Sequence, residues 1–458
     1  MNLANIHSIY FIGIGGIGMS GLARYFQLHG RKISGYDKTR SELTNELMRE
    51  GMQIHFEEDV DAIPKDVDLV VYTPAVPPDH RELSYYREHR YWAIKRSDLL
   101  EELTKDLFTI AVAGTHGKTT TTSMIAHILK SSGYDCTAFL GGISANYHTN
   151  FLAGKNKTVV VEADEFDRSF LKLHPNIAVV TSSDADHLDI YGTQEAVGHA
   201  YADFAGKIKK GGILNTKRNL SYLKLLTTAP TVFYYAAEGL GQEDFYADNL
   251  RIVDGTYAFN FRNASGDIKD IHLGIAGRHN VENSVAAAAV ASQLNIEKNK
   301  IREALNTFKG VKRRFEFIVR NSSVIYIDDY AHHPEEIKAF LASVREIFPG
   351  KKITCIFQPH LYTRTRDFAD DFGKALSLAD ELILLPIYPA RELPIAGVTS
   401  EMIAQKMNLL HKKVVSKADL LTELQQRPLD VLLTMGAGDI DTFIEPIKNL
   451  LNHTPETH

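Results

Sequence analysis

The chain has 458 residues, more than one hydrophobic core usually serves, and we therefore expect two or three domains. A formal net charge of −6 provides no overall positive field, so the composition argues against a nucleic-acid partner. The sequence contains neither a signal-peptide pattern nor an apolar run of about 20 residues that could insert in a membrane. The two cysteines, Cys136 and Cys355, are too few for a disulfide framework, and a reduced, cytoplasmic location is expected.

Strand and helix patterns alternate from the N-terminus. Apolar strands are predicted over 8–15, 32–37 and 68–76, and amphipathic helices that end at a glycine over 19–30 and 43–51. Short crossovers of this kind predict a parallel sheet that binds ligands at the carboxyl ends of its strands.

A glycine loop, Gly13-Ile-Gly15-Gly16-Ile-Gly18, follows the first of these strands, and Asp37 ends the second strand 19 residues later. Such glycines let backbone N–H groups and a helix N-terminus approach a diphosphate. The loop therefore indicates a nucleotide but does not identify NAD, and a purely structural turn is the alternative. The candidate substrate-binding residues here are Gly13, Gly15, Gly16, Gly18, Met19, Ser20 and Asp37.

A second glycine loop lies between the strand predicted over 108–114 and the helix predicted over 118–133. It departs from the G-x-x-x-x-G-K-[ST] pattern because Val112 stands where the first glycine would be. The Gly-Lys-Thr core remains, so Lys118 can neutralise phosphates and a threonine hydroxyl can ligate Mg²⁺. The candidate ATP-binding residues are Gly114, Thr115, His116, Gly117, Lys118, Thr119 and Thr120.

Acidic residues end the next two apolar strands, predicted over 158–165 and 177–187. Parallel strands that end together would bring Glu162 and His187 to the same sheet edge as the second loop. Mg²⁺ prefers oxygen ligands, so Glu162 is the more usual ligand of the two. The metal candidates are Thr119, Thr120, Glu162 and His187, with Asp164, Glu165, Asp184 and Asp186 nearby.

The remaining sequence predicts a hairpin over 256–275 and a helix over 277–294. Four further strand-and-turn segments follow, over 323–341, 352–360, 380–388 and 430–439. Changes of pattern predict three domains, over 1–102, 103–312 and 313–458. Two phosphate loops in one chain suggest that one holds a nucleotide-linked substrate while the other uses ATP on it.

The segments GTHGKTTTT, EADEFDRSF, DADHLDIYG, GRHNVENSVAA and DDYAHHPEE, taken together, resemble the Mur ligase family over nearly the whole chain. This resemblance implies an α/β fold of three domains. They are an N-terminal Rossmann-like parallel sheet that binds the UDP part of the substrate, a central P-loop ATPase-like domain, and a C-terminal Rossmann-like domain.

The resemblance also implies the reaction. ATP, with Mg²⁺, phosphorylates a muramate carboxylate, an amine attacks the acyl phosphate, and phosphate leaves. The segments FIGIGGIGMSGLA and FQPHLYTRTRDF are most similar to those members that join L-alanine to UDP-N-acetylmuramate, a step of peptidoglycan synthesis. The expected partners are these small molecules; the sequence predicts no oligomeric state.

Site roles follow from the same resemblance. It implies that Lys118, His187, His332 and Arg364 are catalytic. The additional residues implied to contact ATP are His279, Asn280, Asn283, Arg314, Asp328 and Asp329, and those implied to line the muramate and amino-acid site are Tyr330, His332, His360 and Arg364.

Two stretches depart from the family pattern. Leu361 stands where arginine is frequent, so Arg364, Arg366 or Arg391 could take over the role of that cation. The segment 141–154 looks shorter than in the family, and it is left without assigned contacts.

Three alternatives stay open at the level of sequence. One is a recycling ligase of the same family that joins a whole tripeptide. The second is an NAD-dependent oxidoreductase built on the first loop, which would leave the second loop unexplained. The third is a nucleotide sensor without ligase activity.

Overall fold

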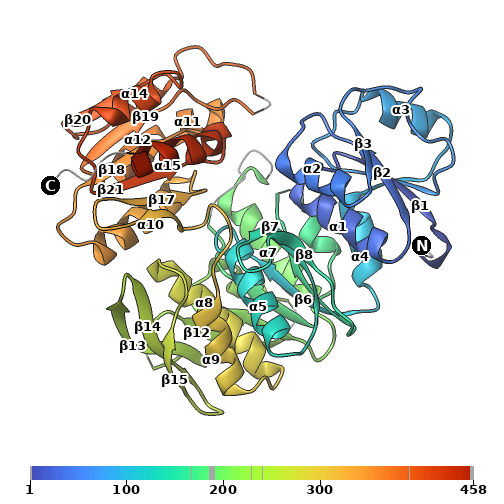
Figure 1. The fold of residues 1–458 in the computed structure, drawn as a ribbon. Coiled ribbons are helices and arrows are strands. Elements are labelled where there is room, and N and C mark those ends of the chain that lie inside the picture. Colours follow the sequence, from blue (N-terminus) through green and yellow to red (C-terminus); the bar gives the residue numbers. More distant parts are fainter. Residues whose placement is uncertain are drawn as a thin grey trace. The chain divides into compact units, whose positions relative to one another are not determined.

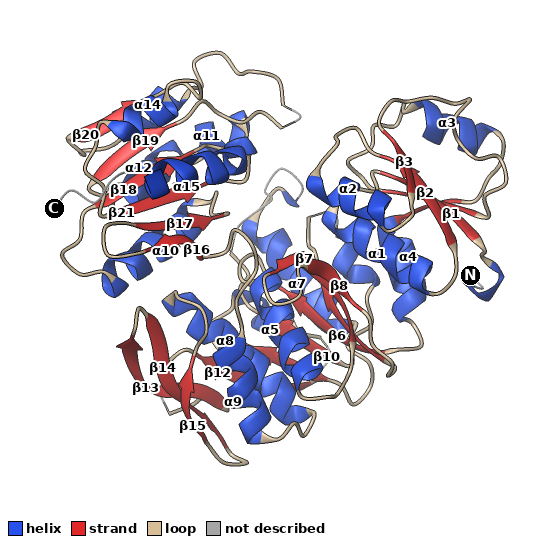
Figure 2. Cartoon of the chain, viewed as in Figure 1, coloured by secondary structure: helices blue, strands red, loops and turns tan. Residues whose placement is uncertain are grey.

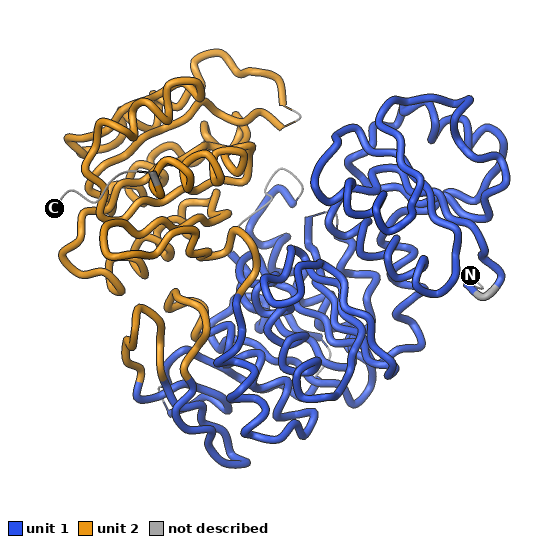
Figure 3. The backbone as a smooth tube through the Cα atoms, in the orientation of Figure 1, with its two compact units in different colours: residues 1–249, 259–271, 282–309 blue, residues 250–258, 272–281, 310–458 orange. Residues whose placement is uncertain are grey.

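The computed structural model describes residues 3–166, 168–184, 191–227, 230–239, 241–390 and 392–453. The chain forms two compact units (Figure 3). Unit 1 comprises residues 1–249, 259–271 and 282–309, and unit 2 comprises residues 250–258, 272–281 and 310–458. Within the described ranges, no helix is both long and apolar enough to cross a membrane.

The N-terminal sheet has five strands in the order β3-β2-β1-β4-β5, and all its pairs are parallel (Figure 1). The strands are β1 Ser8–Ile12, β2 Lys32–Tyr36, β3 Gln53–His55, β4 Leu69–Tyr72 and β5 Ala93–Lys95. The helices are α1 Ile17–Leu28, α2 Glu42–Arg49, α3 Arg81–Glu88 and α4 Arg96–Thr104. Strands β2 and β3 are added on one side of β1, and β4 and β5 on the other. Open α/β sheets bind ligands at such a switch point in strand order.

The central sheet has ten strands in the order β15-β14-β13-β12-β11-β10-β6-β9-β7-β8. Its strands are β6 Phe108–Ala113, β7 Thr137–Ser144, β8 Thr149–Leu152, β9 Thr158–Glu162, β10 Ile177–Val180, β11 Ile213–Thr216, β12 Thr231–Ala236, β13 Phe245–Val253, β14 Thr256–Asn263 and β15 Ile268–His272. Its helices are α5 Lys118–Ser131, α7 Gln194–Gly206, α8 Arg278–Gln293 and α9 Lys298–Thr307. The predicted hairpin corresponds to β14 and β15, which are neighbours in the sheet.

The C-terminal sheet has six strands in the order β16-β17-β21-β18-β19-β20, with helices between them (Figure 2). The strands are β16 Glu316–Arg320, β17 Ile325–Asp329, β18 Ile353–Phe357, β19 Glu381–Leu384, β20 His411–Val414 and β21 Val431–Met435. The helices are α10 Pro334–Ile347, α11 Tyr362–Asp367, α12 Ala369–Leu376, α13 Ser400–Gln405, α14 Leu420–Gln425 and α15 Ile444–His453. The chain thus has three α/β parts, each with its own sheet, and this confirms the predicted fold class.

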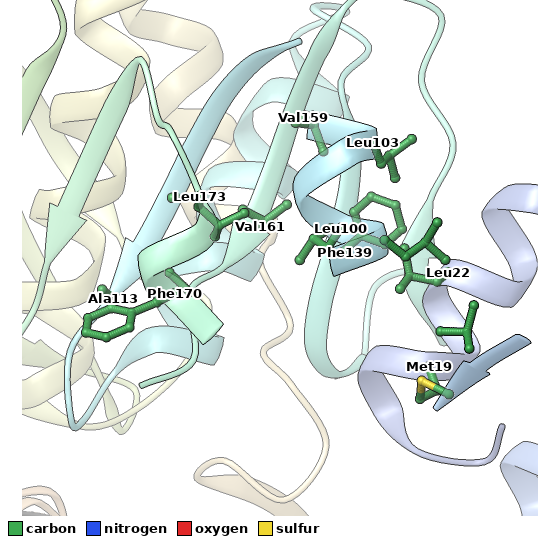
Figure 4. Packing of buried hydrophobic residues seen from close by; sticks show 14 of the residues in the cluster. Met19, Leu22, Leu100, Leu103, Ala113, Phe139, Val159, Val161, Phe170 and Leu173 are labelled. Atoms are coloured by element: carbon green, nitrogen blue, oxygen red, sulfur yellow. The ribbon is translucent and has the colours of Figure 1, made fainter. Parts of the chain in front are cut away.

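One apolar core holds the first two sheets of unit 1 together (Figure 4). Met19 and Leu22 of α1 and Leu100 of α4 belong to the same buried cluster as Phe139 of β7 and Val161 of β9. Burying such side chains is the main favourable term in packing one layer on another. The N-terminus of α1, where the first glycine loop ends, is thereby fixed close to β7 and β9.

Candidate active-site residues of the two units

The first glycine loop is closed by its own acid. Asp37 follows β2, and its carboxylate accepts hydrogen bonds from Gly15 N at 2.8 Å and Thr39 N at 3.0 Å. Gly13 has φ +86°, a conformation that glycine adopts without strain, and its N–H donates to Tyr36 O at 2.7 Å. Asp37 therefore lies beside the first glycine loop and also fixes its conformation.

A cavity of about 760 Å³ starts at this loop. One part of it is lined by Gly13, Gly15, Gly16, Gly18, Met19 and Asp37. Another part is lined by Glu162, the last residue of β9, and by Asp164, two residues later. Ser20 is not among the lining residues. Its side chain is buried, donates to Ile17 O at 3.0 Å and accepts from Asn150 Nδ2 at 2.8 Å.

The second loop takes the shape of a phosphate-binding turn. Gly114 has φ +135° and Gly117 has φ +80°, so glycine is required at both positions. Thr115 Oγ1 lies 2.8 Å from Ser182 Oγ, and that hydroxyl also accepts from His116 N at 2.8 Å. Ser182, two residues after the end of β10, thus fixes the conformation of the loop at the N-terminus of α5.

Lys118 is partly buried at the base of this loop. Its Nζ donates to Gly114 O at 2.7 Å and to Glu165 Oε1 at 2.9 Å. Burial lowers the pKa of the ammonium, but the carboxylates of Glu165, Asp164 and Glu162 outweigh it, and the pKa is raised above its ordinary value. Lys118 therefore stays charged across the whole physiological range.

The metal candidates are only partly brought together. Thr119 Oγ1 donates to Glu162 Oε2 at 2.9 Å, whereas Thr120 is buried and does not take part in that bond. Among the described residues, no group of three or more His, Cys, Asp or Glu side chains could hold a metal ion. His187, the other predicted ligand, lies outside the described residues.

Helix α8 brings Asn283 to the second loop. Asn283 Oδ1 accepts a hydrogen bond from Thr121 Oγ1 at 3.2 Å, and a methyl group at Gly117 would lie 2.7 Å from the same oxygen. Asn283 therefore lies at the phosphate loop, and its contact with ATP stays a prediction.

His279 and Asn280, earlier on α8, belong to unit 2. Burial, and next the charge of Arg314, lower the pKa of His279 to about 4, so its imidazole is neutral at pH 7. Asn280 Nδ2 donates to Ala276 O at 2.6 Å and so fixes the turn before the helix.

In unit 2 the two predicted acids bond to different groups. Asp328 accepts from Arg313 Nε at 2.9 Å. The guanidinium of Arg314, the predicted ATP contact, lies 5.0 Å from the centre of the Tyr330 ring. Asp329 accepts from the backbone N–H of Phe315 at 2.7 Å. Burial, opposed by Arg314, raises the pKa of Asp329 to about 6.

The loop after β17 gathers the candidates for the amino-acid site. His332 Nδ1 donates to Tyr330 O at 3.1 Å and lies 3.4 Å from Glu336 Oε2. The rings of His332 and His360 are 6.0 Å apart, and burial lowers the pKa of His332 to about 4 despite Glu336, with Arg364 acting in the same direction as burial. A neutral His332 whose Nδ1 carries the proton has a free lone pair on Nε2.

Arg364 and Arg366, two of the arginines that could replace the one missing at position 361, follow β18. They have different surroundings. Leu361 immediately precedes α11 and has φ +70°, a conformation that a branched residue rarely adopts. Arg366 Nε donates to the neighbouring Asp367 at 2.7 Å on an exposed surface, while Arg364 is close enough to His332 to affect its pKa. Arg391 lies outside the described residues.

Three residues that contact the candidate site were not predicted as part of it. Glu165 was noted only as a nearby acid, yet it forms the ion pair with Lys118. Ser182 holds the second loop, and Gly141 of β7 lies against Glu162, because a methyl group there would be 1.8 Å from Glu162 Oε2. The glycine pair 141–142, inside the apolar strand β7, was an available signal for the last of these.

Family models match three consecutive parts of the chain. The Mur ligase family catalytic domain matches residues 8–107, the Mur ligase middle domain matches residues 112–291, and the Mur ligase glutamate ligase domain matches residues 313–438.

Two curated relatives and one solved structure are similar over almost their full length. The UDP-N-acetylmuramate–L-alanine ligase of Flavobacterium psychrophilum is 50% identical, with 99% of this chain and 100% of the relative covered. The enzyme of the same name from Flavobacterium johnsoniae is 48% identical, with 99% of each chain covered. The crystal structure of UDP-N-acetylmuramate–alanine ligase from Thermotoga maritima superposes with a TM-score of 0.83 at 29% identity, covering 98% of this chain and 100% of that one. The chain belongs to the Mur ligase family.

Proposed function

We propose that this chain joins L-alanine to the carboxylate of UDP-N-acetylmuramate at the expense of ATP, an early step of peptidoglycan synthesis. The observation that carries the proposal is the cavity of about 760 Å³, because it connects the first glycine loop to Glu162, which is bonded to Thr119 of the second loop. A substrate held by its nucleotide at one end would present its acid at the other. The relatives with about half of their residues identical carry the name of the same reaction.

The chemistry brings two anions together. A carboxylate oxygen attacks the γ-phosphorus of ATP and ADP leaves, giving an acyl phosphate. The amine of L-alanine then displaces phosphate and forms the amide. Lys118 is the charge that lowers the repulsion in the first step. Neutral His332 can accept a hydrogen bond from the alanine ammonium at Nε2 and so orient the amine.

Magnesium suits the oxygen donors at the second loop. Thr119 and Glu162 supply a hydroxyl and a carboxylate that already lie 2.9 Å apart, and we assign them to the ion. When bound, Mg²⁺ would neutralise phosphate charge. We assign the remaining ATP contacts to Asn283 in unit 1 and, in unit 2, to His279, Asn280, Arg314, Asp328 and Asp329.

The test is an ATP-hydrolysis assay with UDP-N-acetylmuramate and each amino acid in turn, with the product identified by mass. L-alanine should stimulate phosphate release and appear in the product. Turnover with the L-alanyl tripeptide and not with L-alanine would instead establish the recycling ligase. Hydride transfer with a nicotinamide cofactor would establish an oxidoreductase. The relatives named above favour neither the recycling ligase nor the oxidoreductase.

Asp37→Ala is expected to weaken binding of the sugar nucleotide about tenfold, because Gly15 N loses its acceptor and the loop loses its shape. ATP affinity should stay within about twofold, since the second loop is untouched. Calorimetric titration with each nucleotide measures both. Asp37→Asn, which retains an acceptor oxygen, serves as the matched variant and should lose less. A larger loss for ATP than for the sugar nucleotide would reassign the first loop.

Gly141→Ala is expected to raise the Mg²⁺ concentration for half-maximal activity about tenfold. A methyl group 1.8 Å from Glu162 Oε2 must displace that flexible carboxylate and weaken its bond to Thr119. Mg²⁺ titration of the initial rate measures the effect. Gly198→Ala in α7, where a methyl group makes only an ordinary 3.5 Å contact with Leu225, is the control. An unchanged Mg²⁺ requirement in Gly141→Ala would contradict the role given to Glu162.

A further inference from the structure

Arg96 is a partly buried arginine on the wall of the cavity that starts at the first glycine loop. It is the first residue of α4, and its guanidinium lies against α1. A methyl group at Gly18 would be 3.1 Å from Arg96 Nη1 and 3.3 Å from its Cζ. Gly18, the last glycine of the loop, therefore leaves room for a guanidinium.

No hydrogen bond or ion pair to another residue that the structure describes engages this guanidinium. The nearest acid on its own helix, Asp98, instead accepts from Lys95 N at 3.0 Å and pairs with Lys172. Of the acids that line the same cavity, Asp37 is bonded to the first loop and Glu162 to Thr119. A partly buried cation without a partner is costly to keep unless it binds an anion.

Stabilisation of α4 does not explain this arginine. A cation at the first position of a helix lies at the positive end of the helix dipole, where it is unfavourable. The N-terminus of α1 is close by and has no side-chain cap. This helix N-terminus and the guanidinium thus make this part of the cavity wall positive.

We propose that Arg96 binds the diphosphate of the sugar nucleotide, an inference that rests on the function proposed above. The planar guanidinium can donate two parallel hydrogen bonds to phosphate oxygens, which a lysine cannot do. The guanidinium lies against Gly18 of the first loop, and Arg96 also lines a second, small pocket together with Glu162 and Asp164. Arg96 is a binding residue for the diphosphate, and the first loop supplies the backbone donors.

Arg96→Gln tests the assignment by calorimetric titration of the full chain with UDP, UMP and ATP. We expect UDP to bind roughly 10- to 100-fold more weakly, because a charge-assisted hydrogen bond is lost, and UMP to be affected less. ATP affinity should be unchanged. Arg96→Lys keeps the charge but lacks the planar pair of N–H donors, and it should recover only part of the loss. Arg31→Gln is the control, since Arg31 is partly buried outside this cavity and donates to His29 O at 2.6 Å.

UDP affinity within about twofold of the unmodified chain would overturn the assignment. So would a loss seen only with the complete substrate, because that result would place Arg96 at the muramate carboxylate. If Arg96→Gln also loses ATP binding, Gly18→Ala decides the question: its methyl group displaces the guanidinium and should weaken UDP binding alone. Failure of the unmodified chain to bind UDP would contradict the proposed function itself and not this residue.

Discussion

Lys118→Ala is expected to lower kcat by about two to four orders of magnitude, because a phosphate-binding charge in a water-poor site contributes roughly 3–5 kcal/mol to the transition state. The structure already holds the ammonium in place through Gly114 O and Glu165. Its raised pKa means that the charge is not lost at any physiological pH. The rate at which the amide product forms in a single turnover measures the effect on the chemical steps.

Loss of fold must be separated from loss of catalysis in this variant. Glu165 has a side chain that is only 2% exposed, so removing Lys118 leaves a buried carboxylate without its ion-pair partner. The double variant Lys118→Ala with Glu165→Gln removes both charges and should fold while remaining inactive. Lys130→Ala, on the same helix but paired with Asp135, should retain full activity. Near-normal kcat in Lys118→Ala would contradict the role assigned to Lys118.

Glu162→Gln is expected to lower kcat about 100-fold at low Mg²⁺, with partial recovery as the Mg²⁺ concentration rises. The amide keeps the shape of the side chain and can still meet the Thr119 hydroxyl, but it lacks the negative charge that attracts a divalent cation. The dependence of the initial rate on Mg²⁺ concentration distinguishes this from general damage.

Asp248→Asn is a suitable comparison for Glu162→Gln. Asp248 also forms a close contact, at 2.6 Å to Arg262 Nε, but it belongs to β13 and not to the cavity. Its Mg²⁺ dependence should match that of the unmodified chain. An equal loss in Glu162→Gln at every Mg²⁺ concentration would show that this carboxylate acts otherwise than as a metal ligand.

The α/β fold with three sheets could be predicted because the sequence patterns that indicate it are local. Apolar strands such as 108–113 end in glycine loops, and glycine is required there for positive φ angles that the structure confirms at Gly114 and Gly117. Strands β3 and β5 were missed because each has only three residues, too few for an alternating pattern to stand out.

The contacts of individual side chains were harder to predict. Arg313 has φ +62°, which the sequence does not signal, and it is the guanidinium of Arg313 that bonds to Asp328. Likewise the pairing of Lys118 with Glu165, and not with Glu162, depends on how the segment after β9 turns. Neighbouring residues of the same type cannot be ranked until the backbone conformation is known.

Isotope transfer tests the central claim most directly. UDP-N-acetylmuramate with ¹⁸O in its carboxylate is turned over with ATP, Mg²⁺ and L-alanine, and the released phosphate is examined by mass spectrometry. If the carboxylate oxygen attacks the γ-phosphorus, one ¹⁸O atom per turnover moves into phosphate and the other stays in the amide. Phosphate released without ¹⁸O while the amide product accumulates would contradict the account.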